Sequence, residues 1–484
     1  MDSTLKAWPP TLPAEELKQL ISYAVDWTTS HGLVMRARNV EGALAVHVPF
    51  ALFPSPYPKD CYDLAWQLQP LFNELVDKIA RDEQFIQTVM ESIADVDDFT
   101  HRLYVLYKET CNLSPNQKIW MALNRSDYLL HQPSAEATVL LQQVELNTIS
   151  SAFAGLSSRT SDLHHYLANR TAFFSASSKN TPDIHASDFP KNESLSGFID
   201  ALAKAWEVYN VPSAAILMIV QPDEHNIYDQ RLIEYGLFEK HGIPVIRCSL
   251  GDVLVHGKHT GTDRRLIVDS KEIAVVYYRA GYGPGDYISE KEWTARHMLE
   301  TSMSIKCPPV VYQLAGTKKM QQYIATAGVL EKFVTNPEHV ALLRSSFTGL
   351  YPLDETPTGM NAYERALKDS SNYVMKPQRE GGGNNIYSSH IREHMLKFSP
   401  SERKAYILMD LIKPPPFKNT LVRNGVAINT EVVSELGIYG AYISDGVQVH
   451  MNQTLGHLLR TKMSSSDEGG VAAGYAVLDS PFLQ

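Results

Sequence analysis

The stretch that most constrains the fold of this chain is residues 213–316, where short apolar segments alternate with a helical pattern. The apolar segments are "AAILMIV" at 214–220, "IPVIRCSL" at 243–250 and "EIAVVYYR" at 272–279. Between the first two, "YDQRLIEYGLFEKHG" at 228–242 is typical of a helix that ends at a glycine. Because alternating strands and helices build α/β units, we predict an α/β domain here.

The 484 residues of the chain are too many for one ordinary hydrophobic core, so we expect more than one domain. Residues 1–212 form the first predicted part, and its first hundred residues show apolar stripes with helical spacing. Residues 317–484 form the last part, which contains strand-like segments such as "AYILMDLI" at 405–412 and "LGIYGAYIS" at 436–444. The predicted fold class is a mixed α/β architecture.

Two further segments of the first part lack the helical pattern. Residues 139–149, "VLLQQVELNTI", show the pattern of a strand. Residues 175–197 are polar and rich in turn formers, and we expect them to be an exposed connection.

Charge and cysteine content exclude several classes of partner. A formal net charge of −10 argues against binding to nucleic acid or to an anionic membrane surface, since both need concentrated positive charge. The longest apolar run is far shorter than the roughly 18 residues of a membrane span. The amino-terminal residues do not have the pattern of a secretory signal, and the four cysteines form no CxxC pair. We therefore expect a reduced, cytoplasmic protein.

The most informative motif is "KPQREGGGNN" at 376–385. Consecutive glycines can adopt positive φ and bring backbone N–H groups close to phosphate oxygens. In an extended strand Lys376, Gln378 and Glu380 point to one side, which places a cation and a carboxylate beside the loop. Lysine neutralises phosphate and carboxylate binds Mg²⁺, so the motif is consistent with nucleoside triphosphate chemistry, although a plain flexible linker remains an alternative.

The common nucleotide-binding signatures are absent. The chain has no GxxxxGK[ST], no HRD and no DFG, and "GYGPG" at 281–285 lacks the spacing of a dinucleotide fingerprint. Any nucleotide site therefore belongs to another class of fold.

A second group of polar residues lies at the end of the strand-like segment, in "VELN". Glu145 and Asn147 are two residues apart, so their side-chain oxygens face the same way along a strand. A carboxylate and an amide oxygen suit a hard cation such as Mg²⁺. The alternative is a turn-capping Asn147 beside a solvated surface acid.

A third group lies in "GHLLRTKMSSSDEGGVAAG" at 456–474. Arg460 and Lys462 are two residues apart and precede a run of small residues. They are either ordinary surface charges or the base of a second loop that closes, with the glycine loop, over an anionic intermediate.

Together these motifs resemble the eukaryotic glutathione synthetase family. The resemblance rests on "RSDY", "QVELNTISSAFAGLSSRT", "NIYDQR", "VVYYRAGY", "QLAGTKKMQQ", "KPQREGGGNN", "SELGIYG" and "HLLRTK…GGVAAG", in that order. It implies an ATP-grasp fold with an inserted α/β substrate-binding domain, a glycine-rich lid at 376–387 and a small-residue loop at 463–474. The implied activity is ATP-dependent carbon–nitrogen ligation of γ-glutamylcysteine with glycine, by a cytoplasmic homodimer.

The resemblance also implies roles for individual residues. Mg²⁺ ligands would be Glu145, Asn147 and Glu380. ATP would contact Lys318, Lys376, Glu380, Gly381, Gly382, Gly383, Asn384, Asn385, Tyr387, Met409, Asp410, Leu411, Ile412, Glu435, Lys462 and Glu468. The dipeptide and glycine would contact Arg125, Ser150, Ser151, Ala152, Phe153, Glu224, His225, Asn226, Gln230, Arg279, Tyr282, Arg460, Val471 and Ala472. Family members often differ at three of these positions, with glutamate for Asp410, serine for Ala152 and aspartate for Glu468.

The chemistry of such a ligation agrees with this set of residues. A carboxylate reacts with an amine only after activation, which ATP supplies by forming an acyl phosphate. Because one anion must then approach another, the cations Lys318, Lys376 and Arg460 would be catalytic together with Mg²⁺. Closing loops would keep water from the acyl phosphate.

Two alternatives stay open at this point. One is a ligase that adds β-alanine or serine, although Ala472 and Ala473 are similar to the glycine-using form. The other is an inactive ATP-binding scaffold, which the three retained metal-ligand positions disfavour.

Overall fold

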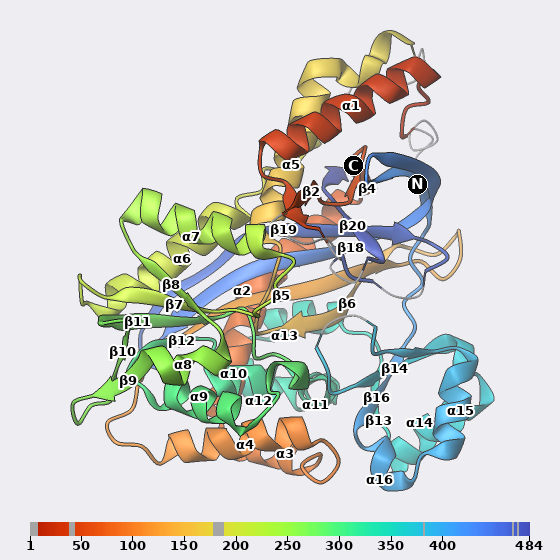
Figure 1. Ribbon diagram of the computed structural model, residues 1–484. Coiled ribbons are helices and arrows are strands. Elements are labelled where there is room, and N and C mark those ends of the chain that lie inside the picture. Colours follow the sequence, from red (N-terminus) through yellow and green to blue (C-terminus); the bar gives the residue numbers. More distant parts are fainter. Residues whose placement is uncertain (1–7, 38–43, 178–187, 381–382, 467–468, 472–473) are drawn as a thin grey trace.

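The computed structural model describes residues 8–37, 44–177, 188–380, 383–466, 469–471 and 474–484. A long twisted sheet of seven strands crosses its centre (Figure 1). Its strand order is β17-β3-β20-β19-β18-β5-β6, with β6 at one edge. The strands are β3 (Phe50–Ala51), β5 (Trp120–His131), β6 (Leu140–Asn147), β17 (Phe417–Arg423), β18 (Val426–Ser444), β19 (Val449–Met463) and β20 (Ala476–Asp479).

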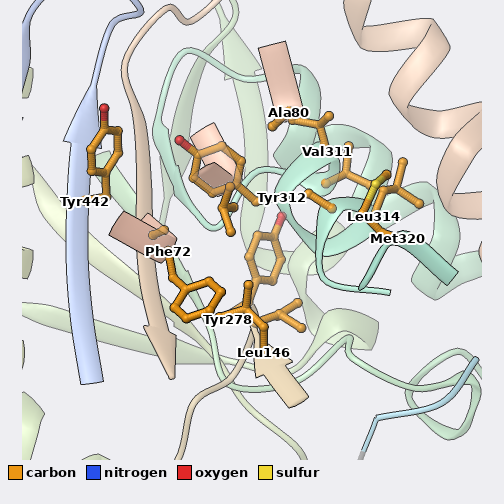
Figure 2. Close-up of a cluster of buried hydrophobic side chains, with 14 of the residues drawn as sticks. Phe72, Ala80, Leu146, Tyr278, Val311, Tyr312, Leu314, Met320 and Tyr442 are labelled. Atoms are coloured by element: carbon orange, nitrogen blue, oxygen red, sulfur yellow. The ribbon is translucent and has the colours of Figure 1, made fainter. Parts of the chain in front are cut away.

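Both faces of this sheet are buried, because successive side chains of β18 point alternately to the two faces and are covered on each. Leu436, Ile438 and Tyr442 pack with α2 (Lys59–Arg81), whereas Tyr439 and Ala441 pack with α5 (Ala154–Thr171) and α6 (Ser194–Tyr209). On the α2 face, Figure 2 shows Phe72, Leu146, Tyr278 and Tyr312 in one cluster with Tyr442. The sequence segment 436–444 is thus only the end of a longer strand than predicted, because the polar residues before it pair with β17 and β19.

A second sheet has six strands, all between residues 215 and 307. β7 (Ala215–Ile219), β8 (Val245–Cys248), β11 (Lys271–Tyr278) and β12 (Ile305–Cys307) are parallel, and β9 (Gly257–Thr260) and β10 (Arg265–Val268) continue it antiparallel. Its helices are α7 (Ile227–His241), α8 (Leu250–His256) and α9 (Glu290–Thr301).

The predicted helix at 228–242 is confirmed, and Gly242 closes it with a φ of 69°, in the left-handed region. The strand predicted at 243–250 is too long at its end. It stops at Cys248 because the Ser249 hydroxyl accepts a hydrogen bond from the Asp252 N–H and caps α8.

A third sheet of four antiparallel strands stands apart at the lower right of Figure 1. It has the order β13-β16-β14-β15, with β13 at Leu350–Pro352, β14 at Tyr373–Pro377, β15 at Ile386–Tyr387 and β16 at Tyr406–Asp410. Met375 and Leu408 pack its buried face against α14 (Pro357–Lys368) and α15 (Ser389–Lys397).

The first hundred residues are only partly helical, which corrects the prediction for this region. Between α1 (Ala14–Ser30) and α2 lie four short strands, β1 (Val34–Arg36), β2 (Ala45–His47), β3 and β4 (Ser55–Tyr57). Strands this short leave no periodic signal in the sequence, and β4 pairs with β21 (Pro481–Leu483) from the other end of the chain.

Several further helical segments complete the described structure, and some of them pack mainly against other helices. They are α3 (Glu83–Glu91), α4 (Asp98–Cys111), α10 (Val310–Ala315), α11 (Lys318–Ala325), α12 (Leu330–Phe333), α13 (Pro337–Ser346) and α16 (Pro400–Arg403), with short 3₁₀ turns η2 (Ala172–Ser177), η4 (Pro284–Asp286) and η5 (Ser370–Asn372). Among the described residues, no helix combines the length and apolarity needed to cross a bilayer.

The connection predicted at 175–197 is not exposed throughout. Residues 178–187 lie outside the described part, but Phe189 is buried against the rings of His165 and Phe482. The segment also contains the start of α6 at Ser194. One aromatic side chain and a helix start were hidden among turn-forming residues.

Candidate active site

A cavity of about 440 Å³ lies between the edge of the seven-stranded sheet and the four-stranded sheet. Its walls come from β6, β18 and β19 on one side and from β14, β15 and β16 on the other, with α11 at the end. The lining includes most residues predicted to bind ATP, namely Lys318, Lys376, Asn385, Tyr387, Met409, Asp410, Leu411, Ile412, Glu435 and Lys462. It also includes Glu145 and Arg460.

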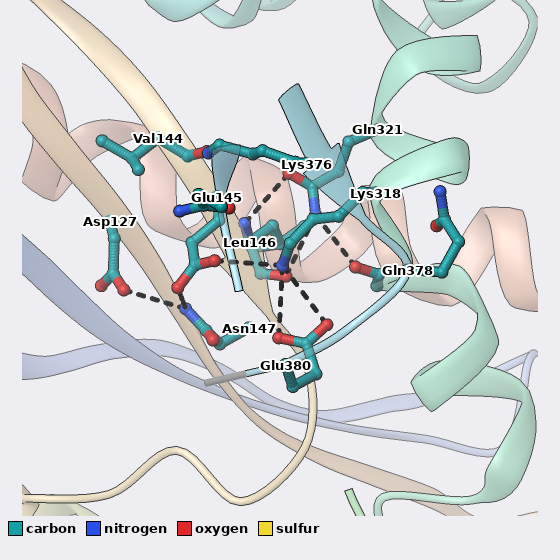
Figure 3. A network of polar contacts seen from close by, with 12 residues as sticks. Asp127, Val144, Glu145, Leu146, Asn147, Lys318, Gln321, Lys376, Gln378 and Glu380 are labelled. Atoms are coloured by element: carbon teal, nitrogen blue, oxygen red, sulfur yellow. Dashed lines mark hydrogen bonds and ion pairs between the residues drawn. The ribbon is translucent and has the colours of Figure 1, made fainter. Parts of the chain in front are cut away.

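The centre of the cavity wall is a buried lysine held between two carboxylates (Figure 3). The Nζ of Lys318 lies 3.0 Å from Glu145 Oε2 and 3.3 Å from Glu380 Oε2. Lys318 is the first residue of α11, where the helix dipole disfavours a cation. The two carboxylates supply the negative charge that makes this position tenable.

Burial and mutual attraction set the protonation of this cluster. Burial alone would raise the pKa of Glu145, but Lys318, Lys376 and Arg460 together hold it well below its usual range. Burial raises the pKa of Glu380, and Lys318 only partly opposes that shift. The pKa of Lys318 lies above its usual value, because Glu145 and Glu380 outweigh the effect of burial. The lysine is therefore a fixed positive charge.

Lys376 supplies a second buried cation from β14. Its Nζ donates to the Val144 carbonyl at 2.9 Å, and burial lowers its pKa to about 8. Further along, the Gln378 side chain accepts from the Lys319 N–H and Glu380 meets Lys318, so all three alternate residues face α11 and β6. This confirms the expectation that they point to one side.

The glycine-rich loop follows these residues. Gly381 and Gly382 lie outside the described residues, and Gly383 has a φ of 93°, which favours glycine. Beyond it, Asn385 donates through Nδ2 to the Tyr387 hydroxyl at 3.2 Å. Asn384 lies between Gly383 and Asn385 in the same loop.

An apolar patch lines the cavity beside β16. Val374, Met409 and Ile412 are buried together and contact Leu129 and Tyr387. The neighbouring Asp410 carboxylate is turned away to accept a hydrogen bond from the Tyr351 hydroxyl at 3.1 Å. The patch therefore presents side chains of low polarity together with the backbone of residues 410–412, an arrangement suited to a flat heteroaromatic base.

The edge strand β6 is fixed by a side chain from α11. Gln321 accepts from the Leu146 N–H at 3.3 Å and donates to the Leu146 carbonyl at 3.5 Å and the Gly316 carbonyl at 2.9 Å. Leu146 is the residue between Glu145 and Asn147. Gln321 thus replaces a neighbouring strand at this point and holds the backbone that carries both predicted ligands.

Asn147 and Glu145 contact each other and a third acid. Asn147 Nδ2 lies 3.2 Å from Glu145 Oε1 and 2.9 Å from Asp127 Oδ2. The reading of Asn147 as a turn cap and of Glu145 as a solvated acid is therefore wrong. The same Asp127 binds Arg125 and Arg460, and Arg460 also pairs with Glu435, so Arg460 is no ordinary surface charge.

The predicted metal ligands fit a magnesium ion by their chemistry. They offer two carboxylates and one amide oxygen, and Mg²⁺ commonly binds one or two protein carboxylates together with substrate phosphates. A positive charge, the Lys318 ammonium, already lies between the two carboxylates. No cluster of three His, Cys, Asp or Glu side chains suited to a metal occurs in the described part of the chain, so this mixed set is the candidate there.

The residues predicted to bind the dipeptide gather beside the turn after β6. Ser150 and Phe153 both have positive φ, 52° and 74°, and the Phe153 N–H donates to Asp229 at 2.9 Å. Arg279 Nη2 donates to the same Asp229 at 3.0 Å. Ala152 offers its carbonyl to the Tyr439 hydroxyl at 2.6 Å and to Arg125 Nη1 at 3.4 Å.

Several buried polar atoms in this region have no partner in the described part of the molecule. They are Arg279 Nε and Nη1, Ser151 Oγ, His225 Nδ1 and Asn226 Oδ1. Since buried polar atoms are almost always hydrogen-bonded, this group indicates a polar ligand with both donors and acceptors.

A second cavity, of about 370 Å³, opens at the carboxyl ends of β7 and β8, where ligands of parallel sheets commonly bind. Glu224 lines it and accepts from the Asn226 N–H at 2.7 Å and from Gln230 Nε2 at 2.8 Å. Tyr282 accepts from Gln221 at 3.2 Å.

The remaining predicted residues belong to the small-residue loop. Val471 is buried in the apolar cluster that contains Phe153. Glu468 and Ala472 lie outside the described residues.

Four of the polar residues that shape the site without having been predicted are Asp127, Asp229, Gln321 and Arg247, which donates to Gln230 at 2.6 Å. Asp127 could have been found from its position two residues after Arg125 on one strand, which places both side chains on the same face. The other three act across elements distant in sequence, and no local pattern marks them.

Comparisons with known proteins identify the family to which the chain is similar. A family model described as "Eukaryotic glutathione synthase, ATP binding domain" matches residues 14–483. The chain is 41% identical over 482 residues to the glutathione synthetase of Mus musculus, covering 98% of this chain and 99% of that protein. It is 42% identical to the chloroplastic glutathione synthetase of Solanum lycopersicum, covering 98% of this chain and 86% of that protein.

A solved structure shares the fold over nearly the whole chain. It is that of a glutathione synthetase-like effector from Globodera pallida in its apo form, with a TM-score of 0.77 and 23% sequence identity. The match covers 98% of both chains. At this identity the likeness concerns the fold alone.

Proposed function

Because the chain belongs to the eukaryotic glutathione synthase family, we propose that it ligates γ-glutamylcysteine to glycine with ATP, yielding glutathione, ADP and phosphate. The fold is of the ATP-grasp type, in which a nucleotide lies between two sheets. The observation that best supports the proposal is the cavity between the seven-stranded and four-stranded sheets, where Lys318, Lys376 and Arg460 meet beside an apolar patch.

The cations of this cavity address the main barrier to the reaction. A substrate carboxylate must attack a phosphate, and each like-charge pair at about 4 Å costs roughly 4 kcal/mol at an effective dielectric of about 20. Lys318 and Arg460 remain charged at neutral pH, as their raised pKa values require. Lys376, with its pKa lowered to about 8, is also mostly protonated there. These groups would lower the repulsion without moving.

Glu145, Asn147 and Glu380 would hold Mg²⁺. The ion would supply further charge neutralisation at the phosphates and orient them. The chain's own contribution is to fix the ligands, through Gln321 at Leu146 and through the ion pairs of Lys318.

The dipeptide would lie between the ATP cavity and the second cavity. Arg279, Ser151 and Asn226 would use their unpartnered polar atoms to bind it, and Arg125 would hold a carboxylate. Adenine would lie against Met409 and Ile412. The glycine-rich loop 376–387 and the small-residue loop 463–474 would exclude water while the acyl phosphate reacts with the amine of glycine.

The predicted domain division and the assembly remain proposals. We propose a core made of residues 1–212 and 317–484, with residues 213–316 as the substrate-binding domain, and a homodimer whose state sedimentation would determine. The cytoplasm is our proposed location. Cys61, Cys111, Cys248 and Cys307 are all free, as in a reducing compartment, but two plant relatives are named chloroplastic.

Ligation is tested by ADP release from ATP and γ-glutamylcysteine with glycine, β-alanine or serine as the third substrate. We expect ADP release to require the amino acid and to be fastest with glycine. ADP release that does not depend on an amino acid would refute ligation. Equal rates with all three would refute glycine as the preferred acceptor, a discrimination worth only about 1–3 kcal/mol per methylene.

A further inference from the structure

One buried carboxylate joins the substrate arginines to the metal ligands. Asp127 lies in the middle of β5, is fully buried, and faces Glu145 of β6 in the sheet register. On its other side it faces Gly437 of β18. A Cβ at Gly437 would lie 2.6 Å from Asp127 Oδ1 and 2.8 Å from Arg125 Cδ, so the glycine makes room for this pair.

Asp127 fixes two guanidinium groups at once. Its Oδ1 accepts from Arg125 Nε at 2.6 Å and its Oδ2 from Arg125 Nη2 at 2.8 Å, a bidentate pair that sets the plane of that guanidinium. The same Oδ2 accepts from Arg460 Nη2 at 3.0 Å. Two buried cations this close would repel each other, and the shared carboxylate holds them together.

Asp127 also determines which way the Asn147 amide points. Asn147 Nδ2 donates to Asp127 Oδ2 at 2.9 Å, and its contact with Glu145 Oε1 turns the same NH₂ group toward carboxylates. Since the oxygen and nitrogen of an amide lie on opposite sides, Asn147 Oδ1 is turned away from both acids. A cation needs that oxygen, not the NH₂ group.

We propose that Asp127 is a positioning residue that couples dipeptide binding to the metal site by holding Arg125, Arg460 and Asn147 in one arrangement. The inference rests on the proposed function, because it assigns Arg125 and Arg460 to the substrates and Asn147 to the metal. Within the described residues, the hydrogen bonds of Asp127 reach neither the apolar patch nor Lys376. Asp127 therefore acts on the dipeptide and the metal and leaves adenine binding alone.

Asp127→Asn tests the inference because it keeps the shape and removes the charge. We expect the KM for γ-glutamylcysteine and the Mg²⁺ concentration for half-maximal rate each to rise roughly tenfold or more, as changes around metal ligands commonly produce. The KM for ATP at saturating Mg²⁺ should change less than about threefold, since adenine contacts are untouched. Calorimetric titration of γ-glutamylcysteine, without turnover, should show the same loss of affinity.

The matched control is Ser126→Ala, the adjacent buried position on the opposite face of β5. It perturbs the same strand and should leave all three constants within about twofold of the parent protein. If Asp127→Asn behaves like Ser126→Ala, or weakens γ-glutamylcysteine and ATP equally, Asp127 is merely structural and the inference is overturned.

If Asp127→Asn does not fold, Gly437→Ala provides the test, because its methyl group displaces Asp127 and Arg125 and keeps the charge. We expect the same selective rise in the γ-glutamylcysteine and Mg²⁺ constants, and unchanged values would overturn the inference. The unmodified protein is assayed in parallel. If it lacks ligase activity, the proposed function fails, whereas activity in it together with unchanged variants refutes only the role of Asp127.

Discussion

Replacing Glu380 by glutamine should separate stability from activity. Lys318 Nζ lies 3.3 Å from Glu380, which corresponds to about 5 kcal/mol of attraction at an effective dielectric of about 20. Glu145 holds the same ammonium at 3.0 Å, so the two carboxylates are no more than about 6 Å apart and repel each other by about 3 kcal/mol. Burying the Glu380 carboxylate costs several kcal/mol more. This cost offsets the net attraction that is left after the repulsion is subtracted.

The direction of the pKa shift of Glu380 also indicates that its negative charge does not stabilise the fold. The folded protein raises the pKa of Glu380, so ionisation of this side chain weakens the fold as pH rises above the usual carboxyl range. Glutamine cannot ionise and keeps the shape. In EDTA and without nucleotide, we therefore expect the Tm of Glu380→Gln to equal or exceed that of the parent protein.

Ligation should fall at the same time by about 10²-fold or more, the usual effect of removing one preorganised electrostatic group. Tm is measured by scanning calorimetry and ligation by ADP release. Glu364→Gln, on the exposed face of α14, is the matched control and should change neither. A Tm clearly below that of the parent protein, or retention of over a tenth of the activity, would refute the reasoning.

Three further predictions follow from individual contacts. Arg460→Lys should lower kcat/KM for γ-glutamylcysteine about 10- to 100-fold in initial-rate assays, because lysine cannot bridge Asp127 and Glu435 as the guanidinium does, and parent-like rates would contradict this. Gln321→Ala should cost about 1–3 kcal/mol in urea unfolding by leaving Leu146 unpaired and should raise the Mg²⁺ requirement; a change in stability alone would count against its role at the metal site. Burial raises the pKa of Asp479 to about 7, so its stabilising contribution is complete below about pH 4 and is lost as pH rises to 7. Asp479→Asn should remove that loss, which is on the order of a few kcal/mol between pH 4 and 7 in urea unfolding. Parallel pH profiles of stability for the variant and the parent protein would contradict this prediction.

Much of the fold followed from local patterns in the sequence. The strand and helix at β7 and α7 have clear periods and a terminal glycine, and the pair Glu145 and Asn147 follows from alternation along a strand. The resemblance to a family then grouped Glu145 and Asn147 with the distant residue Glu380.

Other features could not be read from the sequence, for identifiable physical reasons. Ser150 and Phe153 have positive φ. Residues other than glycine rarely adopt this conformation, so their presence in a sequence does not predict it. The length of β18 depends on pairing with β17 and β19, and the side of Asn147 that faces a cation depends on Asp127 from another strand. These are properties of contacts between distant segments.

The order of strands in the central sheet has a consequence for how the protein is made. β5 and β6 carry Arg125, Glu145 and Asn147, and the other neighbour of β5 in the sheet is β18, which the ribosome synthesises almost three hundred residues later. Until β18 and β19 emerge, β5 and β6 can pair only with each other, and Arg460 does not yet exist. A truncated chain ending before β18 would keep Glu145, Lys318 and Lys376 but lack Glu435, Arg460 and Lys462, so we expect it to have no ligase activity. The chemistry requires synthesis of nearly the whole polypeptide.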